Sequence, residues 1–285
     1  MSDYSTSCNE SGILPIPALS TLNTSDSLIL SHNVISLSHL SLIIDFLPRN
    51  IKFLELSNCS LNDESITLLA KSFTKFFPNL TSLVLDDNNI SHIGVVALVD
   101  SFFLLPAISH LSLASNPIRD TGLSHISDCL GCIDLEYLNL SNCELTDVFI
   151  EEFTCSLVES NVKSLLLSNN NLGDTGLVAL SCLISVSSKL THLEINYVNA
   201  SSREAFDHFI TVLGSSSLKK LAMKGNRMSS TVLCEVCKAV CSSTLEHVEL
   251  LGEEDFSEIH PQLSVVVRSL QNVGFTLDNF GFVIE

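Results

Sequence analysis

The sequence predicts an α/β solenoid, in which short parallel strands alternate with helices in stacked repeats. Three observations predict this fold class. A strand-like motif recurs at a nearly constant interval, and an amphipathic helical pattern follows each copy of it. Hydrophobic residues make up 46% of the 285 residues and charged residues only 16%, so the chain has ample apolar side chains for a core and is not intrinsically disordered.

The recurring motif has the form L-x-L-x-x-N/C-x-L, as in FLELSNCSL, SLVLDDNNI, HLSLASNPI and YLNLSNCEL. The position that follows the strand, here called the slot, lies 26 to 29 residues from the slot of the next copy. A fixed period of this length indicates a repeat architecture. The slot residues expected from the sequence are Asn33, Cys59, Asn88, Asn116, Cys143, Asn170, Asn199 and Asn226.

Helices are predicted between the motifs. After Asn88, apolar residues fall at Val95, Leu98, Val99 and Phe102, which is the i, i+3, i+4, i+7 spacing of one helix face. Such a face cannot be buried within one repeat, but stacked repeats bury a continuous core. The slot side chain is expected to satisfy backbone groups that the turn after the strand leaves buried and unpaired.

With this pattern the chain resembles the leucine-rich repeat family, and in particular the long, intracellular class typified by ribonuclease inhibitor. The resemblance implies a curved horseshoe with parallel strands on its concave face and helices on its convex face. It also implies three parts: an N-terminal segment and partial cap (1–24), a solenoid of about nine repeats (25–270) and C-terminal cap strands (271–285).

Both ends and one repeat depart from the pattern. The strand before Asn199 reaches its Asn one residue late, which predicts a local bulge that pushes Tyr197 outward. The last repeat has Glu253 in place of the slot Asn. The first residues are expected to combine a disordered start with a partial cap formed by Ile13, Leu14, Ile16 and Leu19.

Charge and hydropathy limit the possible functions. With 14 Lys+Arg against 32 Asp+Glu, the net charge is -18, and a broad nucleic-acid-binding surface is excluded. Mean hydropathy is +0.38, yet polar residues and prolines interrupt every long uncharged stretch, so we expect no membrane span and no signal peptide. The charge falls into bands: residues 76–162 are strongly acidic, 163–238 weakly basic and 239–285 acidic again.

No pattern in the sequence supports catalysis, a metal or a cofactor. The ten cysteines are expected to be free thiols. The two CxxC pairs, Cys129–Cys132 and Cys234–Cys237, fall in different repeats, and although Cys241 shares a helix face with the second pair, no fourth ligand is evident. His110, His192 and His247 share a strand position, but their repeats are not neighbours. Glycines are scattered and form no phosphate-binding loop. We therefore expect no metal, no cofactor and no small-molecule substrate.

Exposed strand positions are the candidate binding residues. Large aromatic side chains on a rigid surface are typical anchors for a protein partner, and Phe53, Tyr137 and Tyr197 are the three candidates. The full set expected on the concave face is Phe53, Asp86, Asp87, His110, Tyr137, His192, Tyr197, Lys219, Lys220 and Lys224.

Several functions stay open at this point. The leading hypothesis is a non-enzymatic, intracellular and cytoplasmic scaffold that binds proteins within a larger complex, with a cytoskeletal or ciliary assembly as one setting. The resemblance also allows a ribonuclease-inhibitor-like inhibitor of a basic partner, although the chain lacks Trp. A further alternative is a Ran-type GTPase-activating protein that uses Arg119 or Arg227. The last alternative is that the chain is a regulatory fragment of a larger protein.

Overall fold

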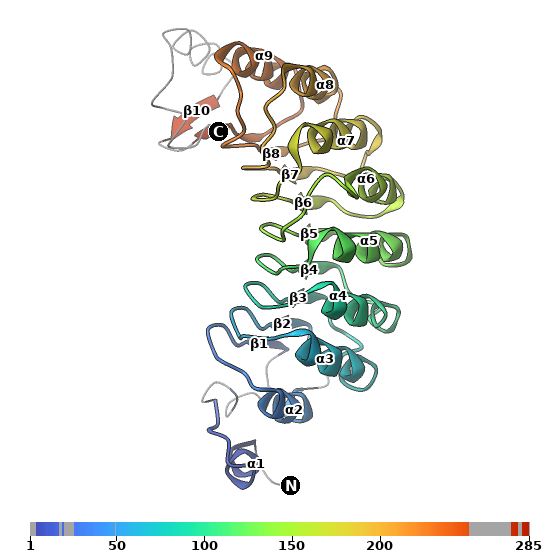
Figure 1. Cartoon of the computed structure of the whole chain (residues 1–285), viewed down its shortest axis with the longest axis vertical. Coiled ribbons are helices and arrows are strands. Elements are labelled where there is room, and N and C mark those ends of the chain that lie inside the picture. The colour runs from blue at the N-terminus through green and yellow to red at the C-terminus, as the bar shows by residue number, and fades with distance from the viewer. Residues whose placement is uncertain are drawn as a thin grey trace. The chain divides into compact units, whose positions relative to one another are not determined.

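The computed structural model describes residues 4–16, 19, 26–48, 50–250, 275–278 and 281–284 (Figure 1). The chain consists of two compact units, Met1–Leu138 (unit 1) and Asn139–Glu285 (unit 2). In each unit strands alternate with helices, and the helices lie on one side of the strands (Figure 1). This is the α/β leucine-rich repeat solenoid that the motif predicts.

Unit 1 contains five α-helices, two 3-10 helices and four complete strands among the described residues. Its strands β1 to β4 are parallel neighbours, and their central residues Leu28, Leu54, Leu83 and Leu111 are paired in register. The elements are α1 (Tyr4–Glu10), β1 (Ser27–Ile29), α2 (Leu37–Phe46), β2 (Phe53–Glu55), α3 (Asp63–Phe76), β3 (Ser82–Val84), α4 (His92–Val99), the 3-10 helix η2 (Phe102–Leu104), β4 (His110–Ser112), α5 (Arg119–Cys129) and η3 (Leu130–Cys132). Strand β5 (Tyr137–Asn139) spans the boundary between the units.

Unit 2 repeats the arrangement. Parallel pairing aligns Leu165, Leu193, Leu221 and Val248 at the centres of its strands β6 to β9. Strand β11 then pairs antiparallel with β9 and with β10. The elements are α6 (Ile150–Glu159), β6 (Ser164–Leu166), α7 (Gly173–Val186), β7 (His192–Glu194), α8 (Arg203–Leu213), β8 (Lys220–Ala222), α9 (Ser230–Cys241), β9 (His247–Glu249), β10 (Phe275–Asp278) and β11 (Gly281–Ile284).

The core lies between the strands and the helices of each unit. Of the helix residues predicted to face it in the repeat after Asn88, Val95, Leu98 and Phe102 are buried, whereas Val99 is partly exposed. Polar N-caps start several helices: the Asn62 side chain accepts a hydrogen bond at the start of α3, and Ser91 does so for α4. Apolar periodicity and caps therefore define the helices together.

The slot amides link neighbouring repeats. The Oδ1 atom of Asn88 accepts the backbone N–H groups of Cys59 and Leu61 at 3.0 Å each, while its Nδ2 donates to the carbonyls of Leu56 and Leu85. The same pattern recurs at Asn170 and Asn226. A cysteine in the slot has only a thiol in place of the amide: the Cys59 thiol donates to the Leu30 carbonyl at 2.6 Å.

The expected bulge at Asn199 is wrong. Asn226 accepts the N–H groups of Val198 and Ala200, so Val198 occupies the slot and no residue is inserted. Val198 is fully buried, whereas Asn199 is exposed and donates to Asn171. The motif suggests the wrong slot residue here because Asn199 directly follows the apolar residue that occupies the slot. The slot at Glu253 lies outside the described residues.

The N-terminal segment also differs from the expectation. Residues Tyr4–Glu10 form a helix rather than a disordered start, and Tyr4 and Cys8 are buried. The Tyr4 hydroxyl and Nε2 of His39 are 2.5 Å apart, which ties this helix to α2. Ile16 and Leu19 are buried as predicted, but Leu14 is 87% exposed and takes no part in the packing.

Candidate protein-binding surface

In unit 1, the outward side chains of β2, β3 and β4 and that of Tyr137 form what we call the unit 1 strand face. Phe53 is partly exposed on β2, and His110 is exposed on β4. The rings of His110 and Tyr137 stack with their centroids 5.8 Å apart and their planes at 18°. Two of the three predicted aromatic candidates thus lie on this face, and a histidine ring extends the apolar surface of one of them.

Carboxylates accompany these rings. Asp86 is partly buried at the end of β3, where it accepts hydrogen bonds from the Ser112 hydroxyl at 2.6 Å and the Ala114 N–H at 2.9 Å. Burial raises the pKa of Asp86, the two hydrogen bonds oppose this, and the charges of Glu55 and Asp87 raise it further. Asp86 therefore joins neighbouring repeats, whereas the adjacent Asp87 is exposed.

The unit 2 strand face consists of the outward side chains of β6 to β9 and of Tyr197 and Lys224 just after the strands. Two of its strands carry a histidine–glutamate pair: His192 Nε2 lies 3.0 Å from Glu194 Oε1, and His247 Nε2 lies 3.1 Å from Glu249 Oε1. Between them, Ala222 leaves a hollow of about 190 Å³ that Lys220 also lines.

Two lysines of the predicted basic band are paired with carboxylates close to this face. The Lys224 ammonium lies 2.6 Å from Glu249, and the Lys219 ammonium lies 3.2 Å from Glu246. Burial alone would raise the pKa of Glu249, but the hydrogen bonds and charges of Lys224 and His247 lower it. Lys220 is exposed and forms no ion pair with any described residue, so it is the cation this face offers to a partner.

Tyr197 has an unusual backbone. Its φ is 54°, in the left-handed region, which is a strained conformation for a bulky residue. The equivalent position, directly before the slot, is His32, Asn58, Asp87, Ser115, Asn142, Asn169 or Gly225 in other repeats, all with positive φ. The turn explains the outward position of Tyr197, which is 39% exposed, without any bulge.

The described residues contain no group of three or more His, Cys, Asp and Glu side chains able to hold a metal ion. The ten cysteines are free, and burial raises the pKa of the Cys129 and Cys237 thiols to about 12. In the part of the chain that is described, no helix combines the length and apolar character needed to cross a bilayer.

The repeat pattern does not predict one feature of this surface. Phe103 is 76% exposed and lines a hollow on the helix side of unit 1, together with Cys129 and Cys132. The sequence does contain a sign of this exposed ring, because Phe103 follows the last apolar position of the helix pattern and does not belong to the buried face. The hollow itself depends on how two neighbouring repeats pack, which the motif does not specify.

Comparison with known proteins identifies the class. Residues 78–99, 108–127 and 159–181 match a family model described as Leucine Rich repeat, and residues 134–156 match a second model of the same description. The chain is a leucine-rich repeat protein, and its repeats are of the ribonuclease-inhibitor-like class.

Its relatives include larger proteins. The NACHT, LRR and PYD domains-containing protein 5 of Homo sapiens is 28% identical over 209 residues, which cover 72% of this chain and 17% of that protein. Protein 13 of the same series in Homo sapiens is 31% identical, over 65% of this chain and 18% of that protein. The ribonuclease inhibitor of Mus musculus is 26% identical, over 65% of this chain and 41% of its own length. The chain thus spans less than half the length of each of these relatives.

Proposed function

We propose that the protein is a non-enzymatic scaffold that binds a protein partner through its strand faces. The observation that carries the proposal is Tyr197, an exposed aromatic side chain held at a strained position where other repeats have small or polar residues. Strain of this kind costs stability and is retained mostly where it serves binding or catalysis. A rigid exposed tyrosine loses little conformational entropy on binding, which suits it as an anchor.

Two further features support the strand faces as the contact surface. The stacked rings of His110 and Tyr137 present a second aromatic anchor in unit 1. Lys220, which is exposed and lines the hollow beside Ala222, offers a charge for an acidic group of the partner. Anchors and charges at fixed strand positions give a partner both affinity and orientation.

A finer role within this scaffold function is membership of a larger complex, for which a cytoskeletal or ciliary assembly is our proposed setting. Inhibition of a basic partner is the second candidate, and the cluster of Glu55, Asp86 and Asp87 on unit 1 favours it. A cation of the partner would offset the repulsion among these three carboxylates and so stabilise the complex.

A Ran-type GTPase-activating activity is the enzyme-regulator alternative. Arg119 and Arg227 both have exposed side chains, in the two different units. A Ran GTP-hydrolysis assay separates this alternative from the scaffold: acceleration that is lost in Arg119→Ala or Arg227→Ala would replace our proposal, and hydrolysis at the background rate would agree with it.

Affinity purification of the tagged full chain, followed by mass spectrometry, tests the scaffold proposal. The Tyr137→Ala/Tyr197→Ala variant is compared with Ile93→Ala/Val186→Ala, which removes exposed apolar side chains from helices instead. We expect at least one partner to be recovered by the wild type and the helix variant and lost with the tyrosine variant. Retention of every partner by the tyrosine variant would refute binding through the strand faces.

A further inference from the structure

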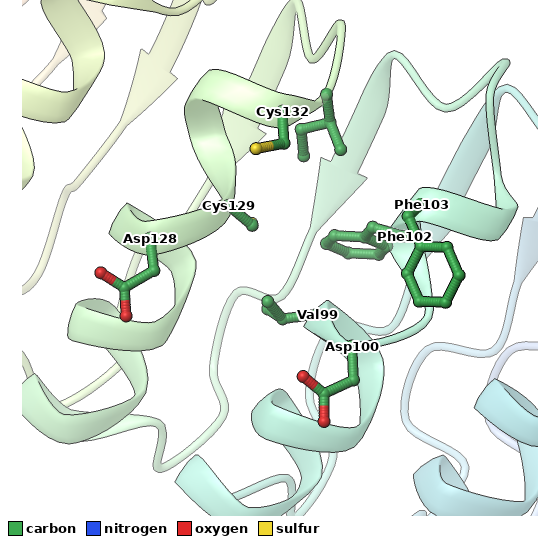
Figure 2. Close-up of a pocket in the computed structure, with 8 residues that line it drawn as sticks. Val99, Asp100, Phe102, Phe103, Asp128, Cys129 and Cys132 are labelled. Carbon is green, nitrogen blue, oxygen red and sulfur yellow. The ribbon is translucent and has the colours of Figure 1, made fainter.

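A hollow of about 400 Å³ opens in unit 1 between the C-terminal ends of α4 and α5 (Figure 2). It lies on the helix side of the repeats and is separate from the strand face. Its walls are largely apolar or sulfur-containing. The side chains that form them are Val99, Phe102, Phe103, Cys129, Cys132 and Ile133.

The two repeats that border the hollow differ at the position after their last buried helix residue. Phe102 and Leu130 are equivalent and both are buried, whereas the next position is Phe103 in one repeat and Gly131 in the other. A Cβ at Gly131 would meet no atom within 4 Å. Phe103 itself lines the hollow and is 76% exposed, and Gly131 presents no side chain at the equivalent position.

Negative charge marks the rim of this hollow. Asp100 and Asp128 occupy equivalent positions at the ends of α4 and α5, both are exposed, and their side chains lie beside the apolar walls (Figure 2). Neither carboxylate forms a hydrogen bond or an ion pair with a described residue, and no basic residue lines the hollow. The C-terminal ends of both helices add partial negative charge at the same place.

Cys129 forms part of the apolar wall of the hollow rather than a reactive group. The Cys129 thiol donates a hydrogen bond to the Ile126 carbonyl at 3.1 Å, and burial raises its pKa to about 12. A thiol in this state is uncharged at neutral pH and is a weak nucleophile. The surroundings thus combine an uncharged, apolar floor with an anionic rim.

From this combination we propose that the hollow is a docking site for a segment of a partner protein that presents a bulky apolar side chain beside a Lys or Arg. The apolar side chain packs against Phe103 and removes its ring from water. The cation lies between Asp100 and Asp128, which have no cation of their own. This contact is independent of the strand faces, so one protein can hold two partners at once.

Selection from a displayed library of short random peptides tests this proposal. The full chain is immobilised, and the Phe103→Ala/Asp100→Asn/Asp128→Asn variant is added in excess as a soluble decoy, so that peptides bound elsewhere are removed. We expect the enriched peptides to carry a large apolar residue next to Lys or Arg. Failure to enrich any peptide against the decoy, or enrichment of acidic peptides, would overturn the proposal.

Affinities of an enriched peptide then locate its binding. Phe103→Ala should weaken binding about tenfold, as expected for an aromatic anchor. Asp100→Asn/Asp128→Asn should weaken it by about two- to fivefold at low salt, and this difference should disappear near 1 M salt. Ile93→Ala and Asp45→Asn remove a matched exposed apolar side chain and carboxylate elsewhere in unit 1. Equal weakening by these two control variants would place the peptide outside the hollow and contradict the proposal.

Discussion

The ring of Tyr197 lies against the backbone of Gly225, the residue at the equivalent turn position of the next repeat. A Cβ built at Gly225 would overlap the ring carbons Cδ1 and Cε1 of Tyr197. Gly225 also has a φ of 63°, where a side chain is strained even without a neighbour. Absence of a side chain at Gly225 therefore determines where the exposed tyrosine can lie.

Replacement of Gly225 by alanine should displace the Tyr197 ring and destabilise the protein. The left-handed backbone costs about 1–2 kcal/mol for a residue with a Cβ, and the overlap with the ring adds to it. Denaturant titration of Gly225→Ala, Tyr197→Ala and the double variant measures both parts. Because the overlap needs both side chains, the double variant should lose less stability than the sum of the single variants. Strict additivity would show that the ring does not pack on Gly225.

Asn226 and Asn199 form a matched pair that tests the corrected position of the slot. Asn226→Ala removes the acceptor for the Val198 and Ala200 N–H groups and the donor to the Ile195 carbonyl, all within the buried turn. We expect the free energy of unfolding to fall by about 2–4 kcal/mol. Asn199→Ala removes one exposed hydrogen bond and places an alanine at a φ of 63°, so it should lower the free energy of unfolding by only about 1 kcal/mol. The opposite ranking would restore Asn199 to the slot.

Asp86→Asn should stabilise the protein at pH 7, by up to about 1 kcal/mol. The folded pKa of Asp86 is raised, so the folded state binds the proton more tightly than the unfolded state, and the wild type loses stability as the pH rises through that pKa. The asparagine Oδ1 can still accept from Ser112 and Ala114. In thermal melts across pH, the gain should vanish below about pH 4, where Asp86 is protonated in both states. A loss of stability at pH 7 would contradict the assigned shift.

Glu249→Gln should have the opposite sign. Hydrogen bonds from Lys224 and His247 lower the folded pKa of Glu249, despite its burial, so the carboxylate contributes stability above its unfolded value of about 4.5. We expect a loss of up to about 1 kcal/mol at pH 7, since the pair is partly exposed to solvent. The same melts should show this loss shrinking as the pH falls below about 4.5. A loss that persists at pH 3 would have another cause.

The repeat period and the helix face could be predicted from the sequence because burial imposes them on every repeat. Phe53 and Tyr137 were assigned to the strand face for the same reason, since strand side chains alternate. The ion pairs of Lys219 and Lys224 and the backbone contacts of Asp86 could not be predicted, because they depend on which side chains meet across neighbouring strands. Asn199 was misassigned because a buried Val198 resembles no slot residue.

Calorimetric titration of the purified chain with a partner recovered by affinity purification measures directly whether the strand faces bind a protein partner. Wild type, Tyr137→Ala, Tyr197→Ala and the helix variant Ile93→Ala/Val186→Ala are titrated in parallel. We expect the Kd to be about tenfold higher for at least one tyrosine variant and unchanged for the helix variant. Unchanged affinity in both tyrosine variants, with a weaker Kd in the helix variant, would contradict binding through the strand faces.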